Sequence, residues 1–405
     1  MLDDFGQRIR DIILSEMDLS RELSDEEICD LIGSVVSREA RDRPMTIKDR
    51  AELERTIFNS LRKLDVLQEL VDDRNVTEIM VNGPNDIFYE KAGKIQKFKG
   101  HFSSEEKLED VIQQIVGRHN RVVNQASPIV DTRLSDGSRV NIVLNPISIG
   151  GSAVSIRKFP ERPMSMERLV EIEALSPEVA RLLQILTQAK YNIFISGGTG
   201  SGKTTFLNAL SQYIPDDERI ITIEDSAELQ LLGAKNIVRL ETRNANTDGV
   251  TPITIRDLIR TALRMRPDRI IVGECRGAEA LDMLQAMNTG HDGSLSTGHA
   301  NSPHDIVSRI ETMVLQGQDF PLNAIRQQIA SGIDIIVQLG RLRDKSRRVL
   351  EISEVDGFMD GEIVLHTLYR FEETAVLDSG RIQGFLKKEG TLCHTDKLMA
   401  AGLSV

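Results

Sequence analysis

The segment from Gly197 to Thr204 has the residue types and the spacing needed to hold a chain of phosphates. It reads Gly-Gly-Thr-Gly-Ser-Gly-Lys-Thr and matches the pattern G-x-x-x-x-G-K-[ST] completely. Its glycines let consecutive backbone N–H groups turn inward around phosphates, and the dipole of a following helix favours negative charge there. Lys203 would reach the β and γ phosphates, and the Thr204 hydroxyl would bind Mg²⁺.

The sequence on either side supports this interpretation. An apolar run at 191–195 precedes the motif and a helix-like stretch at 205–213 follows it, which is the context that a phosphate-binding loop requires. The alternative, a glycine-rich turn between a strand and a helix, is weaker for that reason. The residues predicted to bind a nucleoside triphosphate are Gly197, Gly198, Thr199, Gly200, Ser201, Gly202, Lys203, Thr204 and Thr205.

Hydrolysis of a bound triphosphate also needs carboxylates near the metal ion and the attacking water. Glu224 and Glu228 belong to an acidic cluster that follows an apolar run at 220–223, where open α/β sheets place their ligands; the alternative is a solvated acidic loop. Glu274 ends another apolar run and could orient water and take its proton. A simple salt bridge between Glu274 and Arg276 is equally compatible with the sequence.

A segment rich in glycine, histidine and hydroxyl side chains spans residues 289–301. We interpret it as a loop in which His299 senses the γ phosphate or positions water. His291 and His299 could form a metal pair, but their spacing matches no familiar zinc pattern. Arg260, Arg264 and Arg266 lie near the end of a predicted helix, where cations interact favourably with the helix dipole in any case, so the sequence leaves their role open.

Composition limits the class of protein. The 405 residues carry a net charge of −12, which disfavours a protein that coats nucleic acid. No apolar stretch approaches the roughly 18–20 residues needed to cross a bilayer, and no signal peptide is recognisable. We therefore expect a cytoplasmic location. The three cysteines are widely separated, which indicates neither a disulfide framework nor a zinc site.

Hydrophobic periodicity divides the chain into several parts. Helical spacing near the N-terminus gives way to short β-like runs, and then to strands that alternate with helices, as in a mostly parallel α/β sheet. The strands expected in that α/β sheet are 193–196, 220–223, 237–240, 269–272 and 333–339. The expected parts are a helical extension at 1–72, an α+β domain at 73–159, a linker at 160–167, an α/β domain at 168–345 and a β-rich tail at 346–405.

Taken in order, these motifs resemble those of the secretion and pilus traffic ATPases, the type II and type IV secretion family. The resemblance covers residues 75–340 and includes the segments at 197–204, 223–228, 270–274 and 290–301. Within the family, residues 263–277 and 290–301 are most similar to the CpaF/TadA group, which serves Tad/Flp pili. The four-cysteine zinc insertion of many type II secretion members is absent from this sequence.

The resemblance implies a PAS-like domain followed by a RecA-like P-loop domain, assembled as a homo-hexamer that uses ATP and Mg²⁺. Family members employ arginines of the first domain as fingers on the γ phosphate. The matching positions here are Arg139 and Arg157, with Arg133 a weaker candidate. The residues expected to act in catalysis are Glu274, Glu224, Glu228, His299, Arg139 and Arg157.

The leading functional hypothesis is an ATP-driven motor that assembles or retracts a pilus at the inner membrane. It would bind inner-membrane platform proteins and associate with the membrane through them, without binding nucleic acid directly. One alternative is an export ATPase of a type IV secretion system. Another is a nucleotide-binding scaffold that does not hydrolyse ATP, which would have no need of a water-orienting carboxylate such as Glu274.

Overall fold

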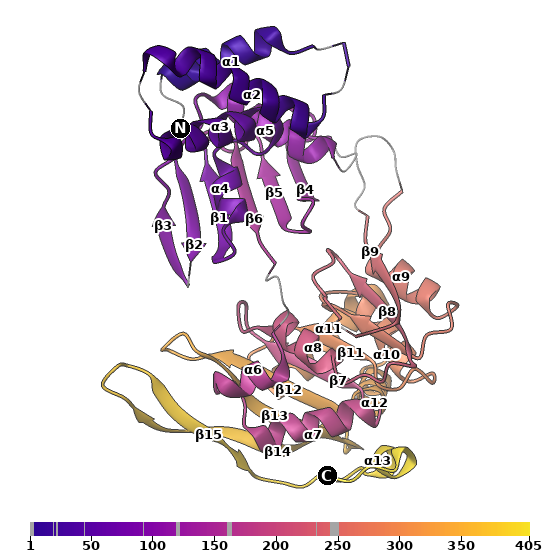
Figure 1. The fold of residues 1–405 in the computed structure, drawn as a ribbon. Coiled ribbons are helices and arrows are strands. Elements are labelled where there is room, and N and C mark those ends of the chain that lie inside the picture. Colours follow the sequence, from indigo (N-terminus) through magenta and orange to yellow (C-terminus); the bar gives the residue numbers. More distant parts are fainter. Residues whose placement is uncertain are drawn as a thin grey trace. The chain divides into compact units, whose positions relative to one another are not determined.

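The structure, a computed structural model, describes residues 4–18, 20–21, 23–43, 45–91, 93–118, 122–159, 164–231, 233–243 and 251–405. The chain forms two compact units, Met1–Glu161 and Arg162–Val405 (Figure 1). Residues 160–163, which make up half of the predicted linker, lie outside the described residues. Each unit is considered by itself below.

The first unit begins with a helical bundle of α1 (Asp4–Glu16), α2 (Asp25–Glu39), the short 3₁₀ helix η1 (Ala40–Asp42) and α3 (Ile47–Arg62). Helix α2 begins with a capping box: the Ser24 side chain accepts from the Glu27 amide, and the Glu27 side chain accepts from the Ser24 amide. Apolar residues at helical spacing, such as Ile9 and Ile13, form the core of the bundle.

The rest of the first unit is a six-stranded antiparallel sheet with two helices, and its strands lie in the order β3-β2-β1-β6-β5-β4. Its elements are β1 (Val76–Asn82), β2 (Ile87–Lys91), β3 (Lys94–Lys97), β4 (Ile129–Arg133), β5 (Arg139–Val143) and β6 (Ala153–Arg157), with helices α4 (Leu67–Asp72) and α5 (Glu105–Gly117). Helix α5 begins at Glu105 because the Ser104 hydroxyl accepts from the Lys107 amide and caps the helix.

The second unit is built on a nine-stranded sheet in the order β15-β14-β13-β12-β7-β11-β10-β8-β9. Strands β12, β7, β11, β10, β8 and β9 run parallel, and β13, β14 and β15 continue the sheet antiparallel. The strands are β7 (Ile193–Gly197), β8 (Arg219–Glu224), β9 (Asn236–Glu241), β10 (Arg269–Val272), β11 (Leu295–Gly298), β12 (Ile335–Arg341), β13 (Arg347–Met359), β14 (Glu362–Val376) and β15 (Ile382–Lys388).

The interpretation of residues 289–301 as a loop was wrong in one respect, because this segment contains β11. The strand is buried and pairs with β7 on one side and β10 on the other. Its four residues, Leu-Ser-Thr-Gly, carry one large apolar side chain, so no apolar run marks it in the sequence. The glycine is required by packing, since a Cβ at Gly298 would lie 2.9 Å from a ring carbon of Phe194.

Alternate residues of the central strands enter two separate cores, so both faces of the sheet are covered by helices. Ile193 and Ile195 pack into one core, and Phe194 between them packs into the other. The first core includes α6 (Met166–Glu171), α7 (Pro177–Gln188) and α8 (Lys203–Ser211). The second includes α9 (Ile255–Ala262), α10 (Glu279–Met287), α11 (Pro303–Gly317) and α12 (Leu322–Gly332).

Residues 393–401 pack near the start of β12, at the end of the parallel strands that is opposite the phosphate-binding motif. Residues Asp360 and Gly361, with φ of 52° and 87°, form the turn between β13 and β14. The buried Glu354 carboxylate accepts from the amides of Cys393 and His394 at 2.7 and 2.8 Å. Helix α13 (Asp396–Ala401) follows. In the described part of the chain, no helix is long and apolar enough to cross a membrane.

Arg269 at the start of β10 is fully buried, and its guanidinium donates to both Glu218 carboxylate oxygens at 2.5 and 3.0 Å. Arg269→Leu is expected to lower the free energy of unfolding by about 3–5 kcal/mol, because the Glu218 carboxylate would stay buried without this partner. Urea denaturation measures the change. The double variant Arg269→Leu/Glu218→Leu should recover part of the loss, and an equal or larger loss in the double variant would contradict this account.

Candidate active site

The phosphate-binding motif forms the turn between β7 and α8. Gly200 and Gly202 have φ of 71° and 94°, a backbone conformation that favours glycine. Helix α8 begins at Lys203, two residues before the expected start, and no side chain caps it. Its first amides are therefore available to an anion, which fits the predicted role in phosphate binding. Thr204 lies in the first turn, where its hydroxyl would hold Mg²⁺ and so help to neutralise phosphate charge.

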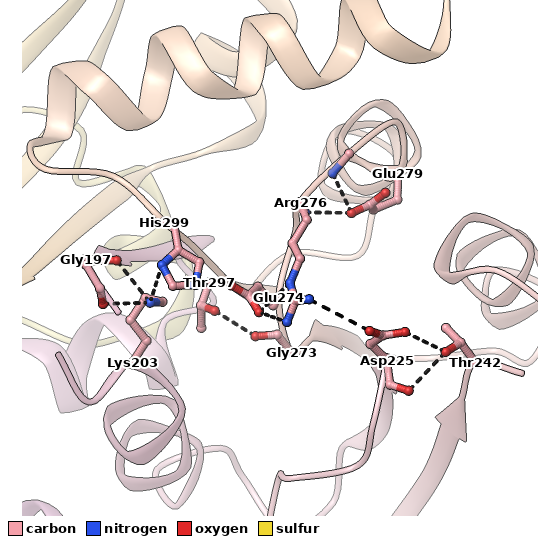
Figure 2. A network of polar contacts seen from close by, with 12 residues as sticks. Gly197, Lys203, Asp225, Thr242, Gly273, Glu274, Arg276, Glu279, Thr297 and His299 are labelled. Carbon is pink, nitrogen blue, oxygen red and sulfur yellow. Dashed lines mark hydrogen bonds and ion pairs between the residues drawn. The ribbon is translucent and has the colours of Figure 1, made fainter. Parts of the chain in front are cut away.

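The Lys203 side chain lies folded back into this turn (Figure 2). Its ammonium group donates to the carbonyls of Gly197 and Gly198 at 3.0 and 3.1 Å, and lies 3.3 Å from His299 Nδ1. Desolvation by burial lowers the pKa of Lys203, while the Glu274 carboxylate opposes this shift. The loop carbonyls thus accept hydrogen bonds from the ammonium group that a bound phosphate would otherwise accept.

His299 connects this lysine to Glu274. Its Nε2 lies 2.6 Å from Glu274 Oε1, and its Nδ1 faces the Lys203 ammonium. Because an ammonium group can only donate, Nδ1 must accept, and the proton of the neutral ring is on Nε2, the nitrogen nearer the carboxylate. Burial, followed by the charge of Lys203, lowers the pKa of His299, which favours this neutral form. The structure thus brings together His299 and Glu274, two residues that the sequence analysis proposed for catalysis.

Arg276 holds the other oxygen of the same carboxylate. Its Nη2 and Nε lie 2.5 and 2.8 Å from Glu274 Oε2, and its Nη1 lies 3.9 Å from Asp225 (Figure 2). The salt bridge between Glu274 and Arg276, one of the two alternatives that the sequence left open, is present, and the same carboxylate also contacts His299. This contact raises the pKa of Arg276.

Two further contacts involve Glu224 at the end of β8 and Arg347 at the start of β13. Glu224 is buried, and its Oε1 accepts from the amides of Glu228 and Leu229 at 2.7 and 2.9 Å, so this carboxylate fixes the turn that follows β8. Arg347, which sequence reasoning missed, donates from Nε to the Gly200 carbonyl at 2.8 Å. No sequence motif could have found Arg347, since only the pairing of β12 with β7 and β13 brings it to the loop.

The remaining candidates in the second unit do not meet at this site. His291 precedes β11 and His299 follows it, so the strand separates the two rings. In the described part of the chain, no group of three or more His, Cys, Asp or Glu residues could hold a metal ion. Arg260 pairs with the buried Asp282 at 2.8 Å.

Three arginines lie in one row across the sheet of the first unit. Arg133 on β4 is opposite Arg139 on β5, and Arg139 is opposite Arg157 on β6. Directly opposed residues of antiparallel strands project from the same face. Glu78 on β1 continues the row beside Arg157. Three adjacent positive charges on one face suit the recognition of an anion.

Comparisons with known proteins agree with this arrangement. The sequence model of the family described as "Type II/IV secretion system protein" matches residues 60–382. This chain belongs to that family. The conjugal transfer protein TrbB of Rhizobium radiobacter is 31% identical over 332 residues, covering 81% of this chain and 98% of TrbB. The type IV secretion system protein PtlH of Bordetella pertussis is 33% identical over 320 residues, covering 73% of this chain and 94% of PtlH.

Similar solved structures establish the fold. The ATPase DotB of Legionella pneumophila has a TM-score of 0.53 at 22% identity, covering 72% of this chain and 80% of that chain. The pilus retraction motor PilT, solved with bound ADP, has a TM-score of 0.52 at 22% identity, covering 76% of this chain and 82% of that chain. The predicted fold, a RecA-like α/β domain preceded by an α+β domain, is confirmed.

The contacts of His299 predict how its ring titrates. The unfolded chain binds a proton there near the ordinary pKa of 6.5, and the folded protein binds it at a lower pH. The unfolded state therefore binds more protons as the pH falls below 6.5, and the free energy of unfolding decreases through that window. Lys203→Ala should raise the pKa of His299 by removing a positive charge, and Glu274→Gln should lower it further.

Titration of the His299 ring by NMR measures these shifts, with His299→Gln used to assign the resonance. Lys387→Ala, which removes an exposed lysine of β15, should leave the titration unchanged. Equal pKa values in the Lys203→Ala variant and the unsubstituted protein would contradict the described contact.

Proposed function

We propose that this protein is an ATP-hydrolysing motor that works as a hexameric ring at the cytoplasmic side of the inner membrane. The observation that best supports hydrolysis is the contact of His299 with both Lys203 and Glu274. A pure nucleotide binder needs the phosphate-binding loop but not a carboxylate linked to it. Membership of the family, which includes proteins described as ATPases, supports the same conclusion.

In the proposed reaction, ATP displaces Lys203 from the carbonyls of Gly197 and Gly198, because a triphosphate is the stronger acceptor for an ammonium group. Glu274 then orients the attacking water and accepts its proton. His299 borders the carboxylate through its Nε2, and Glu224 holds the turn beyond β8. Mg²⁺ supplies charge neutralisation on the phosphates when it is bound.

The assignment to Tad/Flp pili is also our proposal, and it rests on the similarity of residues 263–277 and 290–301 to the CpaF/TadA group. In this role the ring would bind inner-membrane platform proteins and drive assembly or retraction of pilin. The second candidate is an export ATPase of a type IV secretion system, which the descriptions of TrbB and PtlH favour. Loss of pili or loss of substrate transfer in a deletion strain distinguishes the two.

The decisive test of hydrolysis compares the unsubstituted protein with Glu274→Gln and Lys203→Ala. We expect Glu274→Gln to bind ATP and lose turnover by about 10²–10⁴-fold, as is usual for a general base. Lys203→Ala should lose binding. Glu372→Gln in β14, a half-exposed carboxylate paired with Lys387, is the matched control and should keep full activity.

Light scattering in each nucleotide state measures the mass of the assembly. A monomer that binds ATP without turnover would favour the scaffold.

The arginine row provides a second test. We propose that Arg139 and Arg157, from the domain at 73–159, stabilise charge on the phosphoryl group held by the domain at 168–345. Replacing a finger of this kind costs on the order of 10³-fold or more in kcat, so Arg139→Ala and Arg157→Ala should each lose kcat while still binding ATP. Arg8→Ala, on the exposed surface of α1, is the control. Full activity of both variants would overturn this role.

A further inference from the structure

The backbone that bears Glu274 remains tied to both neighbouring strands after β10 has ended at Val272. On the β8 side, the Gly273 amide donates to the Ile223 carbonyl at 2.9 Å. On the β11 side, both contacts come from Thr297. Its hydroxyl donates to the Gly273 carbonyl at 2.8 Å (Figure 2), and its carbonyl accepts from the Cys275 amide at 2.8 Å. One residue thus holds the chain immediately before and after Glu274.

Thr297 is suited to this task by its burial and its shape. Its exposed fraction is 1%, so water does not compete for its hydroxyl. Threonine is stiff about its first side-chain torsion, which limits the directions in which the hydroxyl points. Two residues further along, the His299 ring contacts the Glu274 carboxylate. The end of β11 therefore fixes the glutamate through its backbone and through its side chain.

We propose that Thr297 is a positioning residue for Glu274. The inference rests on the proposed hydrolysis of ATP, and it adds a residue that does not touch the nucleotide. A general base must lie within hydrogen-bonding reach of the water that it deprotonates. Because a misplacement of about 1 Å can cost on the order of 10²-fold in rate, a hydrogen bond that fixes the backbone of the base contributes to kcat rather than to nucleotide affinity.

The chain offers a matched pair of substitutions. Thr297→Val keeps the shape of the side chain and removes the hydroxyl, and Thr297→Ser restores the hydroxyl. Thr222 on β8 is the control: it is also fully buried, and its hydroxyl has no hydrogen-bond partner among the described residues. Thr222→Val therefore introduces the same chemical change in the same sheet without breaking a hydrogen bond.

Steady-state kinetics provides the first readout. Thr297→Val should lower kcat on the order of 10- to 100-fold and leave the KM for ATP within about twofold, since the phosphate-binding loop is untouched. Thr297→Ser and Thr222→Val should retain most of the activity of the unsubstituted protein. An unchanged kcat in Thr297→Val, or a raised KM with unchanged kcat, would overturn the inference.

Labelling of Cys275 provides a second readout that does not depend on hydrolysis. Cys275 is buried directly after Glu274, and burial raises the pKa of its thiol, so alkylation by N-ethylmaleimide should be slow. Thr297→Val should accelerate this labelling several-fold, as followed by mass spectrometry, while the exposed Cys29 and Cys393 react as before. Unchanged labelling of Cys275 overturns the inference on its own. Absence of turnover in the unsubstituted protein would instead overturn the proposed function.

Discussion

The parallel pairing of β11 with β7 and β10 is the constraint on which the candidate site depends. Strand β7 leads to the phosphate-binding loop, β10 leads to Glu274, and β11 leads to His299. Because parallel strands deliver their carboxyl ends to one edge of a sheet, three segments far apart in the sequence meet there. The ring of His299 can contact Lys203 and Glu274 together only because its strand lies between theirs.

Several of these features could be predicted from the sequence. The loop at 197–204, the acidic cluster after β8 and the glutamate after β10 all follow apolar runs, and periodicity identifies such runs well. The capping box at Ser24 and the turn at Asp360 and Gly361 were also predictable, because both depend on residues that are close in sequence. Local chemistry is sufficient to specify features of this kind.

The features that could not be predicted depend on contacts between distant parts of the chain. Strand β11 lacks an apolar run because the space above it is already filled at Gly298, where Phe194 of β7 and Ile306 of α11 leave no room for a side chain. Arg347 reaches Gly200 across 147 residues of sequence. Arg276 was visible as a neighbour of Glu274, but the sequence could not reveal that one carboxylate contacts an arginine and a histidine at once. The arginine row follows from strand register, which no alternation pattern specifies.

The attachment of the chain's end has a mechanical consequence. Lys397 of α13 binds Asp334 at 2.6 Å and also Asp292 at 2.8 Å, and Asp292 lies in the turn that leads into β11. Only the four-residue strand then separates that turn from the segment bearing His299. A force applied to the last helix would therefore act on the turn before β11, and a stiff β-strand is well able to transmit tension along its length to the histidine.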